Sequence, residues 1–343
     1  MSMRIQEKDL PSIAILGATG VVGIECLKLL AERNYPADKI SLLASPRSAG
    51  KFIEYLDEKL IVEDTNQDSF NEKNVVFISA ETQVSLKYAP IAVSKGSLVI
   101  DDSSAFRMNK NVPLVVPEVN PEDIFLHQGI ISIPNCTTTP LVMLIYAIEK
   151  LSKVKRLVVS TYQSVSGAGK LATEELFNQS NDWLQNREIS SKIFPYPIAF
   201  SLIPQVDDFE LDGYTKEEHK MINETRKILH NPEMRITSTC VRVPVPITHC
   251  ESINLELSDN LDLQSIYNAL DSMTGIEVLG KNNFEEYPMP FNSSGKDPVF
   301  VGRIRKDLSC ENGFSMWLAS DNLRKGAALN ALQIMEKAFS IKY

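Results

Sequence analysis

A cysteine followed by three threonines is the part of this 343-residue sequence that points most directly to chemistry. Cys136 stands in the segment Ile133–Pro140, between a strand-like run and the apolar run Leu141–Ile148. We therefore expect Cys136 at the N-terminus of a helix whose first turn the threonines cap. The helix dipole and the unpaired N–H groups there lower the pKa of a thiol and bind a developing oxyanion. Cys136 is thus a candidate nucleophile for attack on a carbonyl carbon.

The remaining cysteines give no comparable signal. They contain no CxxC pair, so we expect neither a zinc site nor a disulfide framework, and no other metal site. We interpret them as small buried hydrophobic residues of a reduced, cytoplasmic protein. They are Cys26, Cys240, Cys250 and Cys310.

Three glycines with the spacing GxxGxxG lie between the apolar run Ile13–Leu16 and a segment with helical periodicity. In a strand–turn–helix unit, small residues let the backbone approach a pyrophosphate at the start of the helix. The spacing departs from GxGxxG, so a tight turn without a ligand is the alternative. The predicted dinucleotide contacts are Gly17, Thr19, Gly20, Val21 and Val22.

The end of the next strand-like run, Ile40–Ala44, indicates which dinucleotide binds. An NAD enzyme places Asp or Glu there, on the ribose hydroxyls. This sequence instead has Ser45, Arg47 and Ser48. A guanidinium between two hydroxyls suits a 2′-phosphate, so we predict NADP as the cofactor, with Arg47 as an ordinary solvated residue as the alternative.

The elements that must position these residues divide the chain into two halves. In the first half, short apolar runs alternate with stretches long enough for crossovers, which predicts a parallel sheet. These runs are Ile13–Leu16, Ile40–Ala44, Val75–Ile78, Leu98–Ile100, Leu114–Val116 and Ile130–Ile133. After Pro134 the strand candidates are longer and the helices collect between and after them. They are Arg156–Tyr162, Ile236–Val245, Ser252–Leu257, Val299–Lys306 and Gly313–Ala319.

The predicted fold class is therefore α/β, with an α+β second half. Residues 1–134 form an NADP-binding, Rossmann-type domain with a parallel sheet. Residues 135–321 form a catalytic and dimerisation domain with a mixed sheet. Residues 322–343 form a C-terminal helix that packs back on the first domain.

Composition and charge exclude several classes of protein. The hydrophobic fraction of 43% and the charged fraction of 23% are those of a globular protein with a sizeable core. A net charge of −9 argues against nucleic acid and anionic membranes as partners. The opening segment MSMRIQEKDLPS is polar, so we expect no signal peptide, and no apolar run approaches the length of a membrane span.

Taken together, the motifs along the chain resemble aspartate-β-semialdehyde dehydrogenase. They occur in order from residue 13 to about residue 335: GATGVVG, DDSSAFRM, VVPEVNP, PNCTT, YQSVSGAG, CVRVPV followed by His249, and SDNLRKGAALNA. The resemblance implies a homodimer or homotetramer that uses NADPH to reduce aspartyl phosphate, a small molecule, to aspartate semialdehyde and phosphate. In bacteria this step feeds the biosynthesis of lysine, diaminopimelate, threonine, methionine and isoleucine.

The resemblance also implies roles for individual residues. Cys136 would be the nucleophile that forms a thioester, His249 the acid/base, and Gln163 a residue that orients the substrate. Arg242 would bind the substrate α-carboxylate, and Arg107 and Lys220 the phosphate. Asn135 and Glu217 complete the predicted substrate site, with Glu217 or Glu218 receiving the substrate ammonium. Ser166, Gly167 and Asn322 would contact the cofactor.

One departure and two rival functions accompany the resemblance. Thr248 stands before His249 where the family usually has glycine, which bears on the local backbone geometry. N-acetyl-γ-glutamyl-phosphate reductase would share the fold, the thiol mechanism and NADPH, but would need no carboxylate for a free ammonium. A catalytically silent relative would be expected to lack Cys136 or His249, and both are present.

Overall fold

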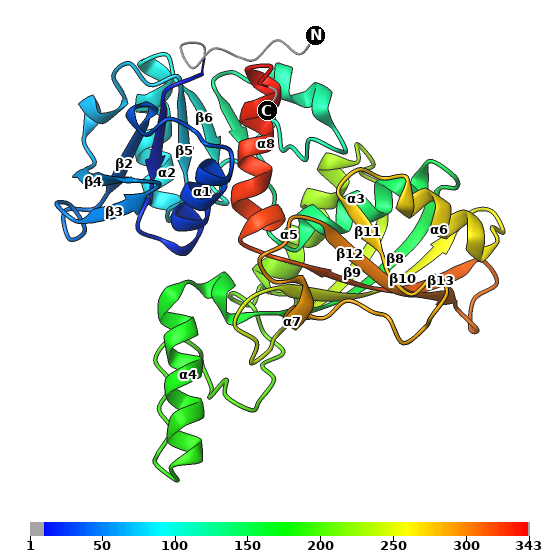
Figure 1. The fold of residues 1–343 in the computed structure, drawn as a ribbon. Helices are drawn as coiled ribbons and strands as arrows, with labels where there is room; N and C mark the ends of the chain where they lie inside the picture. Colours follow the sequence, from blue (N-terminus) through cyan, green and yellow to red (C-terminus); the bar gives the residue numbers. More distant parts are fainter. Residues whose placement is uncertain (1–9, 342–343) are drawn as a thin grey trace. The chain divides into compact units, whose positions relative to one another are not determined.

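The computed structural model describes residues 10–341, in two compact units (Figure 1). The first unit is Met1–Pro134 with Ala327–Tyr343, and the second is Asn135–Gly326. Residues 1–9 and 342–343 lie outside the described part, and with them most of the segment in which no signal peptide is expected. In residues 10–341, no helix is both long enough and apolar enough to span a membrane.

The first unit is built on a seven-stranded sheet in the order β3-β4-β2-β1-β5-β6-β7. All neighbours are parallel except the β3–β4 pair. Its strands are β1 Ile13–Leu16, β2 Ile40–Ala44, β3 Phe52–Tyr55, β4 Glu58–Asp64, β5 Val75–Ile78, β6 Leu98–Asp101 and β7 Ile130–Ser132. Its helices are α1 Val21–Glu32, α2 Thr82–Ser94 and α8 Leu329–Ala338. The predicted Rossmann-type parallel sheet is confirmed.

Two details of this sheet differ from the sequence prediction. The hairpin β3–β4 was not predicted, because its strands are largely exposed and mix polar with apolar residues. The predicted strand Leu114–Val116 is wrong, since only Leu114 forms an isolated bridge, to Ser132. Pro113 and Pro117 flank that run and have no N–H to donate, which prevents longer pairing.

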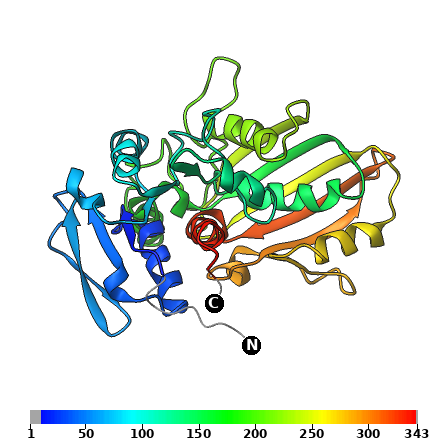
Figure 2. The same cartoon turned by 90° about the horizontal axis from the view of Figure 1, so that it is seen from above.

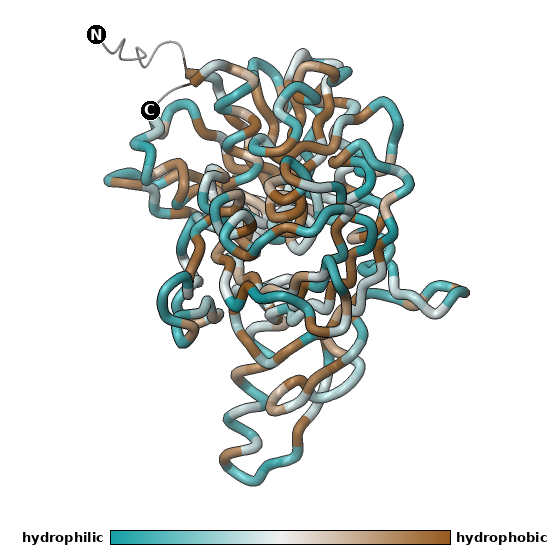
Figure 3. The backbone as a smooth tube through the Cα atoms, turned by 90° about the vertical axis from the view of Figure 1, so that its right-hand side faces the viewer, coloured by the Kyte–Doolittle hydropathy of each residue, from teal (hydrophilic) through white to brown (hydrophobic). Residues whose placement is uncertain are grey.

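Apolar side chains bury both faces of the seven-stranded sheet. One cluster joins the strands to α1 and α8, and a second joins them to α2. Figure 3 shows the hydrophobic segments concentrated in the interior of this unit. Helix α8, from the end of the chain, is thus part of the core that supports the glycine turn at the start of α1.

The second unit is built on a six-stranded mixed sheet in the order β11-β12-β13-β10-β8-β9. Its strands are β8 Val154–Gln163, β9 Arg235–Arg242, β10 His249–Leu257, β11 Ile276–Val278, β12 Val299–Lys306 and β13 Gly313–Ser320. Its helices are α3 Thr138–Glu149, α4 Lys170–Leu184, α5 Lys216–Ile228, α6 Leu263–Asp271 and α7 Pro290–Ser293. Helices α3, α5 and α6 cover one face of the sheet (Figures 1 and 2).

One strand end and one helix start differ from the sequence prediction. Strand β9 ends at Arg242 and not at Val245, since Pro244 and Pro246 interrupt pairing. The predicted C-terminal helix begins with a π-helical turn at Arg324–Ala328 before α8. Residues 322–326 belong to the second unit.

Candidate active site

Strand pairing brings three predicted site residues to one end of the six-stranded sheet. Gln163 at the end of β8 pairs with Arg242 at the end of β9. His249 begins β10, which runs antiparallel to β8, so it lies at the same end. All three side chains are buried. Residues up to 86 positions apart in the sequence, Gln163 and His249, thereby join one polar row.

Cys136 lies in the turn directly before α3 and is half-buried. The prediction that threonines cap this helix is wrong, since Thr137 is the N-cap residue and its side chain makes no capping hydrogen bond. Asn135 performs that role instead: its Oδ1 accepts from the Thr137 N–H at 3.0 Å and from the Thr137 hydroxyl at 2.7 Å. The Cys136 Sγ lies 3.7 Å from the same oxygen.

Glu217, on α5, connects the cysteine turn to the polar row. Its Oε1 accepts from Asn135 Nδ2 at 3.0 Å and from Gln163 Nε2 at 2.9 Å. Its Oε2 accepts from Lys220 Nζ at 3.1 Å. Burial raises the pKa of Glu217, but the charge of Lys220 and the hydrogen bonds outweigh that effect and hold the pKa at about 2. The carboxylate is therefore ionised and held by donors on three sides.

Glu218, the alternative to Glu217, is engaged elsewhere. Its Oε2 accepts from the Thr215 N–H at 2.7 Å in a capping box, and its Oε1 accepts from the Cys240 N–H at 2.9 Å. Glu218 therefore starts α5 and attaches that helix to β9. Of the two carboxylates, only Glu217 belongs to the cluster around Cys136.

Two cations border this cluster. Lys220 Nζ also contacts Asp207 Oδ2 at 2.8 Å. Burial lowers the pKa of Lys220, but the carboxylates of Glu217 and Asp207 raise it by a larger amount. The net shift is upward, so the ammonium stays charged. Arg242 Nη1 donates to the carbonyl of Ser164 at 2.8 Å. Burial lowers the pKa of Arg242, partly offset by the charges of Glu217 and Cys136.

The hydrogen bonds of His249 assign its tautomer. The main-chain N–H of Ser164 donates to Nδ1 at 3.0 Å, so Nδ1 is an acceptor and carries no proton. Burial and the charge of Arg242 lower the pKa of His249 to about 3, which leaves the ring neutral. The proton of the neutral ring is therefore on Nε2, which is buried and has no partner in the described structure. Nε2 is therefore an N–H donor that no group in residues 10–341 accepts.

We expect His249 to make the protein less stable in mild acid. Below the unfolded pKa of about 6.5, the unfolded chain binds a proton on this ring that the folded protein does not bind until about pH 3. The free energy of unfolding therefore falls as the pH falls. His249→Gln should remove about 1 kcal/mol of the loss between pH 6 and 5, measured by urea unfolding. An unchanged loss in the variant would show that His249 is charged in the folded protein.

Two glycines allow close packing around these residues. A Cβ on Gly326 would lie 2.9 Å from the Cβ of Cys136, and a Cβ on Gly167 would lie 3.2 Å from His249 Nε2. Any larger residue at Gly326 would displace the cysteine. Sequence reasoning assigned Gly167 to the cofactor and gave Gly326 no role, although it lies within the quoted SDNLRKGAALNA motif.

Two buried carboxyl groups were also missed. Glu224 Oε2 accepts from the Asn135 N–H at 2.7 Å, which holds the cysteine turn from a second point on α5. Its spacing of seven residues from Glu217 places both on one helix face, and that periodicity was the available signal. Glu251 lies two residues beyond His249 on the same face of β10, is fully buried, and burial raises its pKa well above the usual value.

The other cysteines do not resemble Cys136. Burial raises the pKa of Cys26 and of Cys250 to about 12, and it also raises that of Cys240. These three are the small buried residues that were expected. Cys310 is different, because it is half-buried in the turn between β12 and β13.

The first unit places the predicted dinucleotide residues in two neighbouring loops. Gly17 and Ala18 donate their N–H groups to the carbonyl of Leu43, and the hydroxyls of Thr19 and Ser48 lie 3.4 Å apart. Gly20 is the N-cap of α1, and Val21 and Val22 begin that helix. A Cβ on Gly23 would lie 2.4 Å from the Gly17 carbonyl oxygen, so glycine is needed for this close turn. The turn fits a pyrophosphate at the helix N-terminus.

The second loop carries the residues predicted to select NADP. Ser45 and Arg47 are exposed, whereas Ser48 is buried and its N–H donates to the Ser45 carbonyl at 2.8 Å. The guanidinium thus projects from a closed turn at the end of β2. Among the predicted cofactor contacts, Ser166, Gly167 and Asn322 belong to the second unit.

Arg107 belongs to the first unit and is buried. Its Nη2 donates to the main-chain carbonyl of Asp102 at 2.7 Å and lies 4.0 Å from Asp102 Oδ1. Burial raises the pKa of Asp102 to about 7, against the opposing charge of Arg107. The guanidinium is therefore held at the carboxyl end of β6.

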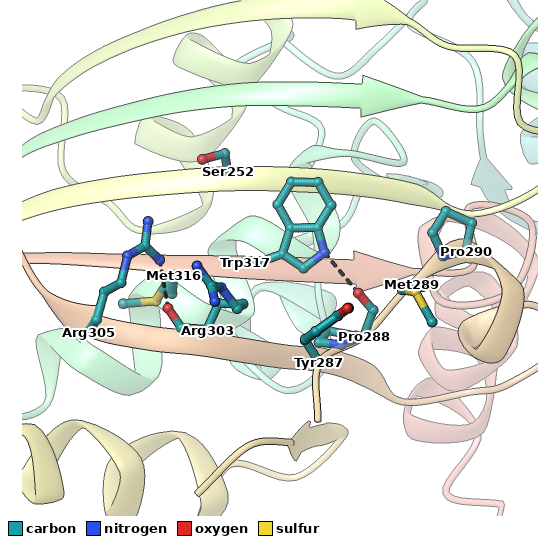
Figure 4. Close-up of a pocket in the computed structure, with 9 residues that line it drawn as sticks. All are labelled: Ser252, Tyr287, Pro288, Met289, Pro290, Arg303, Arg305, Met316 and Trp317. Carbon is teal, nitrogen blue, oxygen red and sulfur yellow. Dashed lines mark hydrogen bonds between the residues drawn. The ribbon is translucent and has the colours of Figure 1, made fainter. Parts of the chain in front are cut away.

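A pocket of about 460 Å³ lies on the other face of the six-stranded sheet and contains none of the predicted site residues (Figure 4). Trp317 closes one side, with its Nε1 donating to the Pro288 carbonyl at 2.9 Å, and Arg303 and Arg305 line another. Across residues 10–341, no group of three or more His, Cys, Asp or Glu side chains could hold a metal ion.

The chain matches two family models that together span most of its length. Residues 12–127 match the NAD-binding domain of semialdehyde dehydrogenases, and residues 146–325 match their dimerisation domain. The chain therefore carries a nicotinamide-cofactor domain and a dimerisation domain.

Individual relatives agree with the family models. The chain is 46% identical to aspartate-semialdehyde dehydrogenase from Bacillus subtilis, over 94% of this chain and 96% of the relative. It superimposes on aspartate semialdehyde dehydrogenase II from Vibrio cholerae, complexed with ASA, with a TM-score of 0.93 and 40% identity, over 97% and 99% of the two chains. The Candida albicans enzyme, solved with NADP, gives a TM-score of 0.72 and 25% identity, over 97% and 100%.

Proposed function

Since the chain belongs to the aspartate-semialdehyde dehydrogenases, we propose that it reduces aspartyl phosphate through a thioester on Cys136, with NADPH as the reductant. The observation that carries this mechanism is one cluster within the second unit. In it Asn135 contacts Cys136, Glu217 joins Asn135 to Gln163, and Arg242 and His249 lie beside Gln163 at the end of the sheet. The cluster combines a thiol at a helix start, a neutral imidazole with its proton on Nε2, and fixed charges of both signs.

The first step is attack of the Cys136 thiolate on the acyl carbon of aspartyl phosphate. A C–S bond forms, the C–O bond to phosphate breaks, and phosphate leaves with the bonding electrons. The N–H groups at the start of α3 stabilise the oxyanion of the tetrahedral adduct. When bound, the nicotinamide cofactor supplies the hydride that reduces the resulting thioester.

His249 then stabilises the oxyanion of the reduced adduct. Its Nε2–H donates a hydrogen bond to the alkoxide, which collapses to the aldehyde as the C–S bond breaks and the Cys136 thiolate leaves. The neutral ring keeps its proton, because losing it would leave an imidazolate and because the Ser164 N–H already occupies Nδ1. Ser164 holds the ring through Nδ1 throughout.

The fixed charges match the two ends of the substrate. Glu217 is ionised and accepts the α-ammonium, while Arg242 binds the α-carboxylate through its planar guanidinium. Lys220 binds the phosphate, and the role of Arg107 in phosphate binding stays a prediction from the sequence resemblance. Gln163, held by Glu217, and Asn135 orient the carbonyl beside the thiol.

A single assay tests this function. Aspartate semialdehyde, phosphate and NADP should together generate the absorbance of reduced nicotinamide. N-acetylglutamate semialdehyde should not replace aspartate semialdehyde, because its acylated nitrogen cannot pair with Glu217. Turnover of the acetylated substrate at an equal rate would favour the reductase alternative.

We also propose NADP as the preferred coenzyme, supported by Arg47 between two serines and by the NADP bound in the Candida albicans relative. Arg47→Ala should raise the Michaelis constant for NADP roughly ten- to a hundredfold. This range corresponds to the loss of about 1.5–3 kcal/mol, the typical contribution of a charge-assisted hydrogen bond. The constant for NAD, which lacks the 2′-phosphate, should change little.

The matched control is Lys51→Ala, which removes an exposed positive charge from the same loop region. It should leave the ratio of the two constants unchanged. Equal losses for NADP and NAD in Arg47→Ala would assign Arg47 to the structure of the turn.

The dimerisation domain supports an assembly of at least two chains, and we propose a homodimer. Sedimentation equilibrium of the full chain distinguishes it from a homotetramer. The same measurement on each variant confirms that a loss of activity does not come from dissociation.

A further inference from the structure

We propose that Asn322 is a positioning residue for His249, which it holds through Thr248 and Ser164. This inference rests on the proposed role of His249 as the Nε2–H donor to the reacting oxygen. It differs from the cofactor contact that the sequence resemblance implies for Asn322. All four residues belong to the second unit.

The Asn322 side chain is buried, and both its amide oxygen and its amide nitrogen form hydrogen bonds within this unit. Its Oδ1 accepts from the Thr248 N–H at 2.9 Å and from the Ser164 hydroxyl at 3.1 Å. Its Nδ2 donates to the Ser166 hydroxyl at 3.0 Å. Because a main-chain N–H can only donate, the amide oxygen must face Thr248, and the orientation of the amide is determined.

Two of these partners are in direct contact with His249. Thr248 is its chain neighbour. Ser164 donates its main-chain N–H to Nδ1 at 3.0 Å, and its hydroxyl oxygen, whose proton is donated to Asn322, lies 3.0 Å from the same nitrogen. Asn322 therefore joins the backbone before the ring to the residue that holds Nδ1. Removing the amide would take one hydrogen bond from each of them at once.

The backbone of Thr248 explains why such a tie is needed. Its φ of +81° lies in the left-handed region, which is unfavourable for a β-branched residue. Its hydroxyl is buried and has no partner in the described structure, so the side chain does not secure this conformation. The hydrogen bond from its N–H to Asn322 is the interaction that does.

The consequence is control of where the imidazole proton resides. While Ser164 stays in place, its N–H occupies Nδ1 and the proton remains on Nε2. If Ser164 moves, both neutral tautomers become accessible, and the Nδ1–H form cannot donate from Nε2.

The test uses Asn322→Ala in the full chain, with ¹⁵N-labelled histidine. The sequence has four histidines, so the His249 signals can be assigned by their loss in His249→Gln. We expect the wild-type protein to show the Nε2–H tautomer at pH 7, and Asn322→Ala to show a mixture. The kcat should fall about tenfold or more, while the Kd for NADP and the KM for phosphate change less than about twofold.

Two matched variants separate this role from a general loss of structure. Thr248→Gly keeps the N–H that binds Asn322 and should retain the Nε2–H tautomer. Asn254→Ala removes a half-buried amide on β10 that bonds to Asp307 and Ser315, and should not alter the His249 signals. A tautomer mixture in Asn254→Ala would contradict a specific role for Asn322.

An Nδ1–H or doubly protonated His249 in the wild-type protein would overturn the inference, even if Asn322→Ala did not fold. The inference would also be overturned if Asn322→Ala kept the Nε2–H tautomer but had a higher Kd for NADP, since that pattern describes a cofactor contact. The NMR measurement needs no turnover, and therefore distinguishes failure of this inference from failure of the proposed activity.

Discussion

Cys136→Ser is expected to lower kcat by on the order of a thousandfold or more while leaving the fold and NADPH binding intact. A serine hydroxyl is almost entirely un-ionised at neutral pH and needs a base to act as a nucleophile. Asn135 Oδ1 lies 3.7 Å from the thiol and is not a base. His249 cannot serve either, because its proton lies on Nε2, the nitrogen that is not held by Ser164. The site is therefore built for a thiolate.

Cys310→Ser is the matched control, since that thiol is also half-buried but lies in the β12–β13 turn. It should retain wild-type kcat. Alkylation by iodoacetamide should inactivate the wild-type protein and the Cys310→Ser variant alike, and aspartate semialdehyde should slow the loss in both. Substantial turnover by Cys136→Ser would disprove the thioester mechanism.

The first domain could be predicted well from the sequence because its strands are buried on both faces. Runs such as Val75–Ile78 are continuously apolar, which distinguishes them from the helices between them. The hairpin β3–β4 escaped prediction for the opposite reason. β3 is the edge strand and β4 lies next to it, both are largely exposed, and Phe52 and Ile61 point apolar side chains to the surface.

Within the site, residue types were predictable but their partners were not. The motif around Cys136 indicated a helix start, yet which side chain capped it depended on the backbone turn at Asn135. Likewise, the sequence could not choose between Glu217 and Glu218. Adjacent helix residues point about 100° apart, so the choice depends on which face of α5 meets β8 and β9, and that is a tertiary property.

The pairing register of β8, β9 and β10 was the second property that could not be predicted from the sequence. Gln163, Arg242 and His249 form one row only because β8 pairs in parallel with β9 and antiparallel with β10. A shift of one residue in any of these strands would turn that strand's side chain to the opposite face of the sheet. The pairing depends on the packing of α3, α5 and α6, which no local pattern encodes.

Arg242→Lys is expected to raise the KM for aspartate semialdehyde about ten- to a hundredfold in the direction that consumes phosphate and the aldehyde. Lysine keeps the positive charge but loses the planar fork that meets a carboxylate at two points. It also loses the Nη1 hydrogen bond to Ser164, which orients the guanidinium. The KM for phosphate should change much less, since phosphate is a separate reactant in this direction.

Lys220→Gln should show the reverse pattern, with phosphate affected more than the aldehyde. Part of that effect is indirect, because Lys220 neutralises Glu217, and an unpaired Glu217 carboxylate would repel the phosphate dianion. Lys216→Gln on the same helix, whose ammonium pairs with the exposed Asp208, is the control and should change neither constant. Arsenate should follow phosphate in every variant. If Arg242→Lys and Lys220→Gln instead each raise the KM for phosphate and the KM for the aldehyde by the same factor, the two cations do not bind different parts of the substrate. Glu217, which interacts with both, would then be the residue through which they act.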